Sequence, residues 1–258
     1  MSDDLFSVRG KTALVTGGSR GIGAMIARGF VADGARVFIA ARKAAELETT
    51  AAELNDLGGG SASAIVADLS SEDGARALAD AVGAQTDHLD VLVNNAGATW
   101  GAPLEDHDQA SWDRVLKLNV AGVFHVTKFC LPLLRAAGSA EEPARVINIG
   151  SIDGIQVPIM ETYSYSSSKA AVHQLTRHLA KQLAPAITVN AVAPGPFESK
   201  MMAATLESFG EQIAEQAPLK RIGRPDDMAG VARFLASRAG AYVTGAIIPV
   251  DGGLATVG

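Results

Sequence analysis

The sequence predicts a single doubly wound α/β domain, in which a mostly seven-stranded parallel sheet carries helices on both faces. Three observations lead to this prediction. Short apolar runs alternate with helical runs of ten or more residues, the strand candidates are apolar on both faces, and no linker-like composition interrupts the pattern. We therefore expect residues 1–258 to form one domain.

The expected elements follow one another in regular order along the chain. Strands, some running into a turn or loop, are expected at Lys11–Gly17, Ala35–Arg42, Ser61–Ser70, Leu89–Gly97, Ala144–Ser151, Ala186–Gly195 and Gly245–Gly253. Helices are expected at Gly21–Gly34, Lys43–Gly58, Ser71–Ala84, about Asp108–Ala136, about Thr162–Gln182 and Pro225–Ser237. Glycine closes the first two helices, Ser71 or Ser70 caps the third, and Pro225 stands in the first turn of the last.

One segment, from about residue 197 to residue 220, breaks this rhythm after the sixth strand. It is rich in Met and Glu, and it could be a plain surface helix pair or a flap over a ligand. We expect a flap, because open α/β sheets bind ligands at the carboxyl ends of their strands.

Composition and charge exclude several classes of protein. The chain is 48% hydrophobic and its net charge is −6 with scattered basic residues, so a large core is possible and nucleic-acid binding is not expected. The single cysteine, Cys130, excludes an internal disulfide framework and lies in an apolar run, so we expect a buried, inert thiol. The first residues are acidic, and we see no stretch with the length and purity of a membrane helix, so we expect a cytoplasmic protein without a membrane partner. No Cys, His or Glu cluster has metal-ligand spacing, and no metal site is expected.

The stretch VTGGSRGIG links the first strand to the first helix. Gly17, Gly21 and Gly23 allow a tight turn, close approach of a pyrophosphate and close packing of helix against strand. The helix N-terminus adds free N–H groups and a partial positive charge. A glycine-rich turn without a ligand is the plain alternative, but the position between strand and helix favours a Rossmann-type dinucleotide site.

The end of the second strand indicates which dinucleotide would bind. An acid there would hydrogen-bond a ribose 2′-hydroxyl and favour NAD, but the sequence reads Ala-Ala-Arg, ending at Arg42. Arg42 and Arg20 would suit a 2′-phosphate, because guanidinium groups match phosphate oxygens, although two ordinary surface arginines are the alternative. We expect NADP(H). Asp68 could meet the adenine amino group or simply cap the following turn.

The stretch YSYSSSK contains two tyrosines before a lysine. Each residue turns a helix by about 100°, so Tyr165 and Lys169, four residues apart, share a face. Tyr163 and Lys169 are six apart and point away from each other, so we assign Tyr163 to a pocket wall or to packing. A solvated amphipathic pair is the alternative for Tyr165 and Lys169.

Taken together, these motifs resemble the short-chain dehydrogenase/reductase family over nearly the whole chain. In order, they are Thr16–Gly23, Asp68, Asn94–Gly97, Asn119, Ser151, Tyr165 with Lys169, and Pro194-Gly195. Within the family the chain is most similar to bacterial 3-oxoacyl-(acyl-carrier-protein) reductases of the rhamnolipid-pathway type, in Leu131–Ser151 and Ala239–Gly253.

The resemblance implies site residues. It implies the catalytic set Asn119, Ser151, Tyr165 and Lys169. It implies cofactor contacts from Gly17, Ser19, Arg20, Gly21, Ile22, Gly23, Arg42, Asp68, Leu69, Asn95, Ala96, Gly97, Tyr165, Lys169, Pro194, Gly195 and Ser199. Ser199 is expected to replace a threonine that usually follows the Pro-Gly pair in the family.

The chemistry expected from this set is reduction of a carbonyl group. NADPH supplies a hydride, and Tyr165 gives a proton to the carbonyl oxygen. A free phenol has a pKa of about 10, and we expect the ammonium of Lys169 to lower it. Ser151 donates to the same oxygen, and the resemblance implies that Asn119 anchors a water that resupplies the proton.

The substrate is expected to be a 3-oxoacyl or similar compound, with an acyl thioester as one form. The thirteen residues between Ser151 and Tyr165 are more than is common in the family, so we expect a bulge near the substrate in residues 153–162. The alternatives are an NAD(H)-dependent alcohol or sugar dehydrogenase, or a cofactor-binding regulator without turnover. A homotetramer is expected from the resemblance.

Overall fold

The computed structural model describes residues 5–199 and 202–257, and it confirms the predicted fold class. Seven parallel strands form one sheet in the order β3-β2-β1-β4-β5-β6-β7. The strands are β1 Thr12–Thr16, β2 Arg36–Ala41, β3 Ser61–Val66, β4 Val91–Asn94, β5 Ala144–Ile149, β6 Ile187–Pro194 and β7 Ile247–Val250. The order reverses direction between β1 and β4, which places a ligand crevice at the carboxyl ends of these strands.

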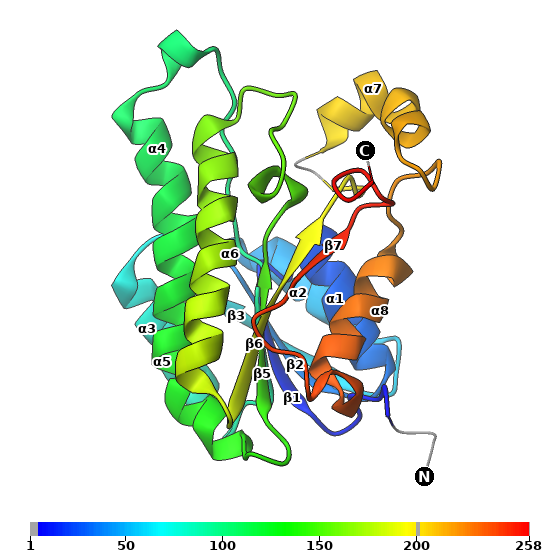
Figure 1. Ribbon diagram of the computed structural model, residues 1–258. Helices are drawn as coiled ribbons and strands as arrows, with labels where there is room; N and C mark the ends of the chain where they lie inside the picture. The colour runs from blue at the N-terminus through cyan, green and yellow to red at the C-terminus, as the bar shows by residue number, and fades with distance from the viewer. Residues whose placement is uncertain (1–4, 200–201, 258) are drawn as a thin grey trace.

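Helices cover both faces of the sheet (Figure 1). They are α1 Gly21–Ala32, α2 Ala44–Asn55, α3 Glu72–Gly83, α4 Gln109–Leu116, α5 Val123–Ala137, α6 Tyr163–Leu183, α7 Ala203–Gln216 and α8 Pro225–Ala236, with short turns η1 Leu104–Asp106, η3 Ile152–Gly154 and η4 Arg238–Gly240. One core cluster joins α1, α2 and α8 to the sheet, and a second joins α3, α5 and α6 to the opposite face. The predicted cap is confirmed, since Ser71 Oγ accepts from the N–H of Gly74 at 3.1 Å.

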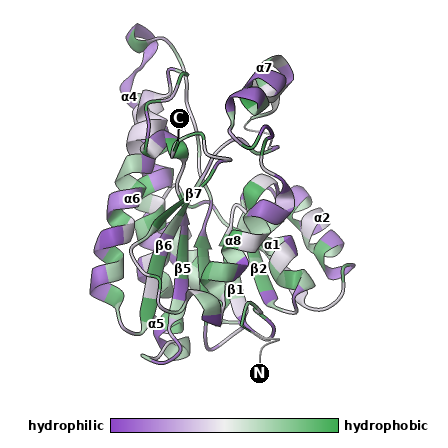
Figure 2. Ribbon diagram, turned by 45° about the vertical axis from the view of Figure 1, so that its right-hand side comes forward, coloured by the Kyte–Doolittle hydropathy of each residue, from purple (hydrophilic) through white to green (hydrophobic). Residues whose placement is uncertain are grey.

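Strand residues alternate between the two core clusters, as a strand covered on both faces requires. Ala13 and Val15 of β1 lie in the α1 cluster, and Leu14 between them lies in the α5 cluster. All five residues of β1 and all eight of β6 are buried. Figure 2 shows the same division, with hydrophobic strands inside and hydrophilic residues on the outer faces of the helices.

The helical region expected near Asp108–Ala136 is one uninterrupted run, because the π-helical turn η2 Lys117–Gly122 joins α4 to α5. Among the described residues, Gln109–Ala137 is long and apolar enough to cross a membrane by length and composition alone, which the sequence reading did not anticipate. The inner face of this run belongs to the core, where Val126, Cys130 and Leu134 are buried. Burial raises the pKa of the Cys130 thiol to about 12, in agreement with an inert cysteine.

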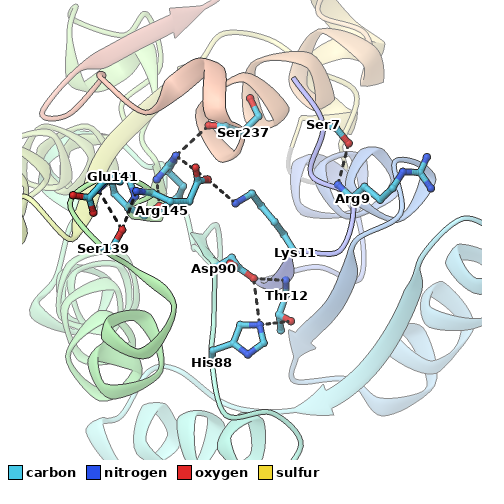
Figure 3. A network of polar contacts seen from close by, with 12 residues as sticks. Ser7, Arg9, Lys11, Thr12, His88, Asp90, Ser139, Glu141, Arg145 and Ser237 are labelled. Carbon is cyan, nitrogen blue, oxygen red and sulfur yellow. Dashed lines mark hydrogen bonds and ion pairs between the residues drawn. The ribbon is translucent and has the colours of Figure 1, made fainter. Parts of the chain in front are cut away.

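The amino ends of the strands are tied together by polar contacts (Figure 3). Arg145 of β5 is 1% exposed and donates to the carbonyls of Pro143 and Ser237. Glu142 accepts from Lys11 at 3.1 Å, and Asp90 accepts from the N–H of Thr12 at 2.7 Å. Ion pairs and hydrogen bonds therefore hold the amino ends of the strands together. The carboxyl ends of the strands carry the candidate site.

The segment expected to form a flap begins at a buried residue. Phe197 is 2% exposed, forms a bridge with Gly223 and belongs to the α1 core cluster, so the start of the segment is packed against the body of the domain. Residues 200 and 201 lie outside the described part of the chain. Helix α7 stands above the carboxyl ends of the strands, where a cover for a ligand would lie (Figure 1).

Candidate active site

The glycine loop between β1 and α1 has the backbone that the sequence predicts. Gly17 and Gly21 have φ of +64° and +52°, a conformation that favours glycine. A Cβ built on Gly23 would lie 2.3 Å from the carbonyl oxygen of Gly17, so no side chain fits there. Ile22, between Gly21 and Gly23, packs against the core. The carbonyl of Ser19 accepts a hydrogen bond from the hydroxyl of Thr50 at 2.8 Å. The loop and the open N-terminus of α1 therefore fit a pyrophosphate.

Asn95 and Ala96 hold this loop in place from β4. The amide of Asn95 donates to the carbonyls of Thr16 and Gly17, at 2.9 and 3.1 Å. The N–H groups of Asn95 and Ala96 both donate to the hydroxyl of Thr16, at 2.9 and 3.1 Å. Asn95 was predicted to contact a cofactor, and in the structure its Nδ2 supports the glycine loop through these two carbonyls.

The two arginines predicted to contact a 2′-phosphate lie in different settings. Arg20 is paired with Glu46 of α2 at 3.0 Å, and its side chain is 51% exposed. Arg42 is exposed just after β2, and its charge helps to lower the pKa of Asp68. The larger cause of that shift is the hydrogen bond from the N–H of Ser70 to Asp68, at 3.1 Å, so the turn-capping alternative for Asp68 is present in the structure.

Tyr165 and Lys169 lie on one face of α6, as helix geometry predicts. The Nζ of Lys169 is 5.4 Å from the centre of the Tyr165 ring and donates to the carbonyl of Ile149 at 2.8 Å. Ser151 lies two residues after the end of β5, is 7% exposed and is hydrogen-bonded to Tyr165. Tyr163 points elsewhere: its hydroxyl donates to Glu161 at 3.1 Å, and its ring meets the edge of His107.

The protonation of the pair differs from the sequence-based expectation. Burial raises the pKa of Tyr165 to about 12. The hydrogen bond from Ser151 lowers this pKa, and the charge of Asp153 raises it further. Burial lowers the pKa of Lys169 to about 8, while Asp153 opposes that shift. Desolvation of the phenolate therefore outweighs the expected influence of Lys169 on the tyrosine.

Asn119 lies in the π-helical turn η2 and is 1% exposed. Its Nδ2 donates to the carbonyl of Ala98 and to Ser168 Oγ, both at 2.9 Å, and its Oδ1 accepts from the N–H of Ala98 at 2.8 Å. Ser168 in turn donates to the carbonyl of Tyr165 at 2.7 Å. Asn119 thus connects the loop after β4 to the helix of the tyrosine. Gly97 lies against it, since a Cβ there would be 3.3 Å from Asn119 Oδ1.

The remaining predicted residues surround the same crevice. Pro194 ends β6, and Gly195 packs so closely on Asp251 that a Cβ would lie 2.7 Å from the Cβ of that residue. A Cβ built on Gly21 would lie 3.3 Å from the Cβ of Ser199, which places Ser199 over the glycine loop. Leu69 is buried after β3 in the α5 core cluster.

A cavity of about 530 Å³ lies at α7; none of the four predicted catalytic residues lines it, but the predicted cofactor contact Ser199 does. Glu198, Glu207 and Glu211 line it together with Ser199, Gly210, Ala214 and Ile222. Its acidic walls would repel a phosphate. Within the described residues, no group of three His, Cys, Asp or Glu side chains is placed to hold a metal ion.

Three groups at the site were missed by the sequence reading. Thr16 supports the loop after β4, as described above, and it stands inside the quoted motif. Asn148 of β5 accepts from Asn94 and donates to Thr176 of α6, both at 2.9 Å, so it ties two strands to the catalytic helix. Asp153 lies in η3 between Ser151 and α6, within the stretch that was expected to bulge.

Comparison with known proteins identifies the class. The family model described as Enoyl-(Acyl carrier protein) reductase matches residues 17–255. The chain belongs to the short-chain dehydrogenase/reductase family, as its motifs predicted, and it is an oxidoreductase of that family.

Particular relatives are similar over nearly their whole length. A rhamnolipids biosynthesis 3-oxoacyl-(acyl-carrier-protein) reductase of Pseudomonas aeruginosa is 52% identical, with 96% of this chain and 97% of the relative covered. A solved active-site complex of Pseudomonas aeruginosa RhlG with NADP has a TM-score of 0.93 at 51% identity, covering 98% of this chain and 99% of the other. A galactitol 2-dehydrogenase of Cereibacter sphaeroides is 38% identical, with 96% of each chain covered.

Proposed function

We propose that the protein reduces the carbonyl group of a 3-oxoacyl-type substrate with NADPH, using Tyr165 as general acid. The observation that carries this proposal is the grouping of Ser151, Tyr165 and Lys169 at the carboxyl end of β5, in the same parallel sheet whose β1 ends at the glycine loop. The similarity to the Pseudomonas aeruginosa 3-oxoacyl-(acyl-carrier-protein) reductase supports the same reaction.

The residues divide the work as follows. Bound NADPH supplies a hydride to the carbonyl carbon. The hydroxyl of Tyr165 gives its proton to the carbonyl oxygen, and Ser151 steadies the charge that develops on that oxygen. Lys169, charged and held by the carbonyl of Ile149, favours the phenolate that remains and holds hydroxyls of the cofactor ribose. Asn119 fixes the helix register through Ser168 and anchors the water that returns the proton.

The cofactor preference rests on the charges beyond β2. Arg42 is exposed there, the sequence Ala-Ala-Arg places no acid at the strand end, and Arg20 is the N-cap residue of α1, paired with Glu46 in the helix that follows Arg42. To bind the 2′-phosphate, Arg20 would have to leave its ion pair with Glu46. The free energy lost is small, because both side chains of the pair are partly exposed to solvent. Asp68 and Ser199 complete the contacts at the adenine and nicotinamide ends.

An apolar rim on the substrate side supports an acyl chain. The rim consists of Trp100, Leu104, Ile155, Val157, Ile159 and Met160, all exposed, with Val157 and Ile159 each 92% exposed. The rim has two segments, residues 100–104 and residues 155–160. They are joined because the N–H of Ala102 donates to the carbonyl of Glu161 at 3.2 Å. The second segment connects Ser151 to Tyr165, so an apolar chain lying on it would present its 3-oxo group to both residues.

The assembly is also a proposal. We infer a homotetramer in the cytoplasm, with one interface formed by the helical run Gln109–Ala137 and α6, whose outer faces carry apolar side chains such as the exposed Phe124. The region of β7, which is half-buried at the edge of the sheet, would form the other. A single 258-residue domain is the repeating unit.

The test is a panel of 3-oxoacyl thioesters, sugars and simple alcohols with NADPH and NADH, for the wild type and Arg42→Ala. The proposal predicts fastest turnover of an oxoacyl compound with NADPH, and a loss of about tenfold or more in NADPH affinity for Arg42→Ala. Faster turnover of a sugar with NAD, unaffected by Arg42→Ala, would favour the activity named for the Cereibacter sphaeroides relative. Tight NADPH binding without turnover of any compound would favour a regulator.

A further inference from the structure

Two loops on the substrate side of the crevice meet where their helices begin. The first loop, residues 95–108, runs from β4 to α4, and the second, residues 150–162, runs from β5 to α6. Each loop carries one segment of the apolar rim. Helices α4 and α6 lie side by side and begin at the same end of the molecule (Figure 1). His107 lies near the end of the first loop, and Tyr163 follows the second directly.

The ring of His107 is hydrogen-bonded to both loops. Its Nε2 lies 3.0 Å from the carbonyl oxygen of Ala102 and 3.4 Å from that of Glu161. A carbonyl oxygen only accepts, so Nε2 carries the proton and donates to both. The backbones also meet here, because the N–H of Ala102 donates to the Glu161 carbonyl at 3.2 Å. A Cβ built on Gly101 would lie 3.2 Å from Cγ2 of Thr162, so the two loops are in direct contact.

Tyr163 fixes the orientation of the His107 ring. The two rings meet edge to face, with their centres 5.1 Å apart and an angle of 82° between their planes. The Tyr163 hydroxyl donates to Oε1 of Glu161 at 3.1 Å, so the tyrosine is held by the residue whose carbonyl accepts from His107. The other ring nitrogen of His107, Nδ1, is buried without a hydrogen-bond partner among the described residues. A phenylalanine ring in its place would therefore remove the Nε2 hydrogen bonds and no other side-chain bond.

We propose that His107 is a positioning residue that sets the spacing of the two rim segments and thereby favours a long acyl chain over a short one. This role rests on the proposed function, because it requires a 3-oxoacyl substrate. A long chain buries apolar surface against both segments, with Leu104 on one side and Val157 on the other. A short chain ends before it reaches them. If the segments separate, the long chain therefore loses contacts that the short chain never makes.

The first test follows the two loops without any substrate. His107→Phe keeps a ring beside Tyr163 but removes the donor. We expect amide hydrogen exchange in His107→Phe, measured by mass spectrometry on peptides covering residues 98–106 and 155–163, to be about threefold to tenfold faster than in the wild type. His107→Gln keeps an N–H donor and is expected to restore the protection, and α3 should exchange equally in all three proteins. Wild-type exchange of both loops in His107→Phe would overturn the proposal. His107→Leu also lacks the donor and takes the place of His107→Phe if the latter does not fold.

The second test compares a long-chain with a short-chain 3-oxoacyl thioester, each with NADPH. We expect His107→Phe to raise KM for the long chain by about threefold to tenfold and to leave kcat and the short-chain KM unchanged, and His107→Gln to recover the wild-type KM. Tyr163→Phe keeps the ring contact and is expected to keep the wild-type preference. An equal change for both chains, or no change for the long chain, would overturn the proposal even if the loops exchange faster. If the wild type reduces no oxo compound, the proposed function fails, and the exchange measurement still decides whether His107 joins the loops.

Discussion

The two sides of the crevice are built by different means. On the cofactor side, Gly17, Gly23 and Asn95 lie within hydrogen-bond or contact distance of one another, and no side chain fits at Gly23. On the substrate side, the rim is apolar and exposed, with Val157 and Ile159 each 92% accessible. The cofactor side tolerates almost no change because its backbone is closely packed. The substrate side can vary, because little else in the fold depends on it.

Among substitutions that compare the two sides, the largest effect is expected from adding a side chain on the cofactor side. Gly23→Val would place a side chain where even a Cβ lies 2.3 Å from the Gly17 carbonyl. We expect NADPH affinity to fall by about a hundredfold or more, measured by fluorescence titration. Gly83→Ala is the control, because a Cβ there meets nothing within 4 Å, and it should bind as the wild type does. Wild-type affinity in Gly23→Val would show that the loop is not the cofactor site.

An intermediate effect is expected where the two sides are joined. Asn119→Ala removes three hydrogen bonds to Ala98 and Ser168 and leaves the N–H of Ala98 unsatisfied, at a cost of about 1–3 kcal/mol in the free energy of unfolding. We expect kcat to fall by about tenfold or more, measured by steady-state kinetics alongside chemical denaturation. Ser166→Ala, which removes a hydroxyl that donates to the carbonyl of Tyr163, is the comparison and should change neither quantity by more than a few-fold. An unaltered kcat in Asn119→Ala would show that Asn119 has no role in catalysis.

The smallest effect is expected on the substrate side. The double change Val157→Ser and Ile159→Ser should raise KM for a long-chain 3-oxoacyl substrate by about threefold to tenfold, because less apolar area is buried against the chain. KM for a short-chain substrate and the melting temperature should stay the same. Leu57→Ser alters an exposed apolar residue at the end of α2 and controls for surface effects. Equal changes in KM for short and long chains would contradict a role of the rim in binding the chain.

Most of the fold and the glycine loop were predictable because local rules govern them. Strands buried on both faces require a covered parallel sheet, and the loop glycines are set by contacts within a few residues or with the next strand. The shared face of Tyr165 and Lys169 followed from helix geometry alone. The burial of Phe197 at the start of the expected flap was not predictable, because it depends on a distant partner, Gly223.

The electrostatics of the site could not be predicted in the same way. The expected lowering of the Tyr165 pKa by Lys169 treated the two side chains as if in water, but burial raises that pKa to about 12. Lys169 is 6% exposed, and how deeply a helix face is buried depends on the elements packed against it, which sequence spacing does not reveal.

The central claim is that Tyr165 is the acid, and pH-resolved kinetics of Tyr165→Phe test it most directly, with Tyr163→Phe as the matched control. The account predicts that Tyr165→Phe still binds NADPH but reduces the oxo substrate about 10²- to 10⁴-fold more slowly, while Tyr163→Phe stays within a few-fold of the wild type. Reduction by Tyr165→Phe at the wild-type rate across the pH range would contradict it.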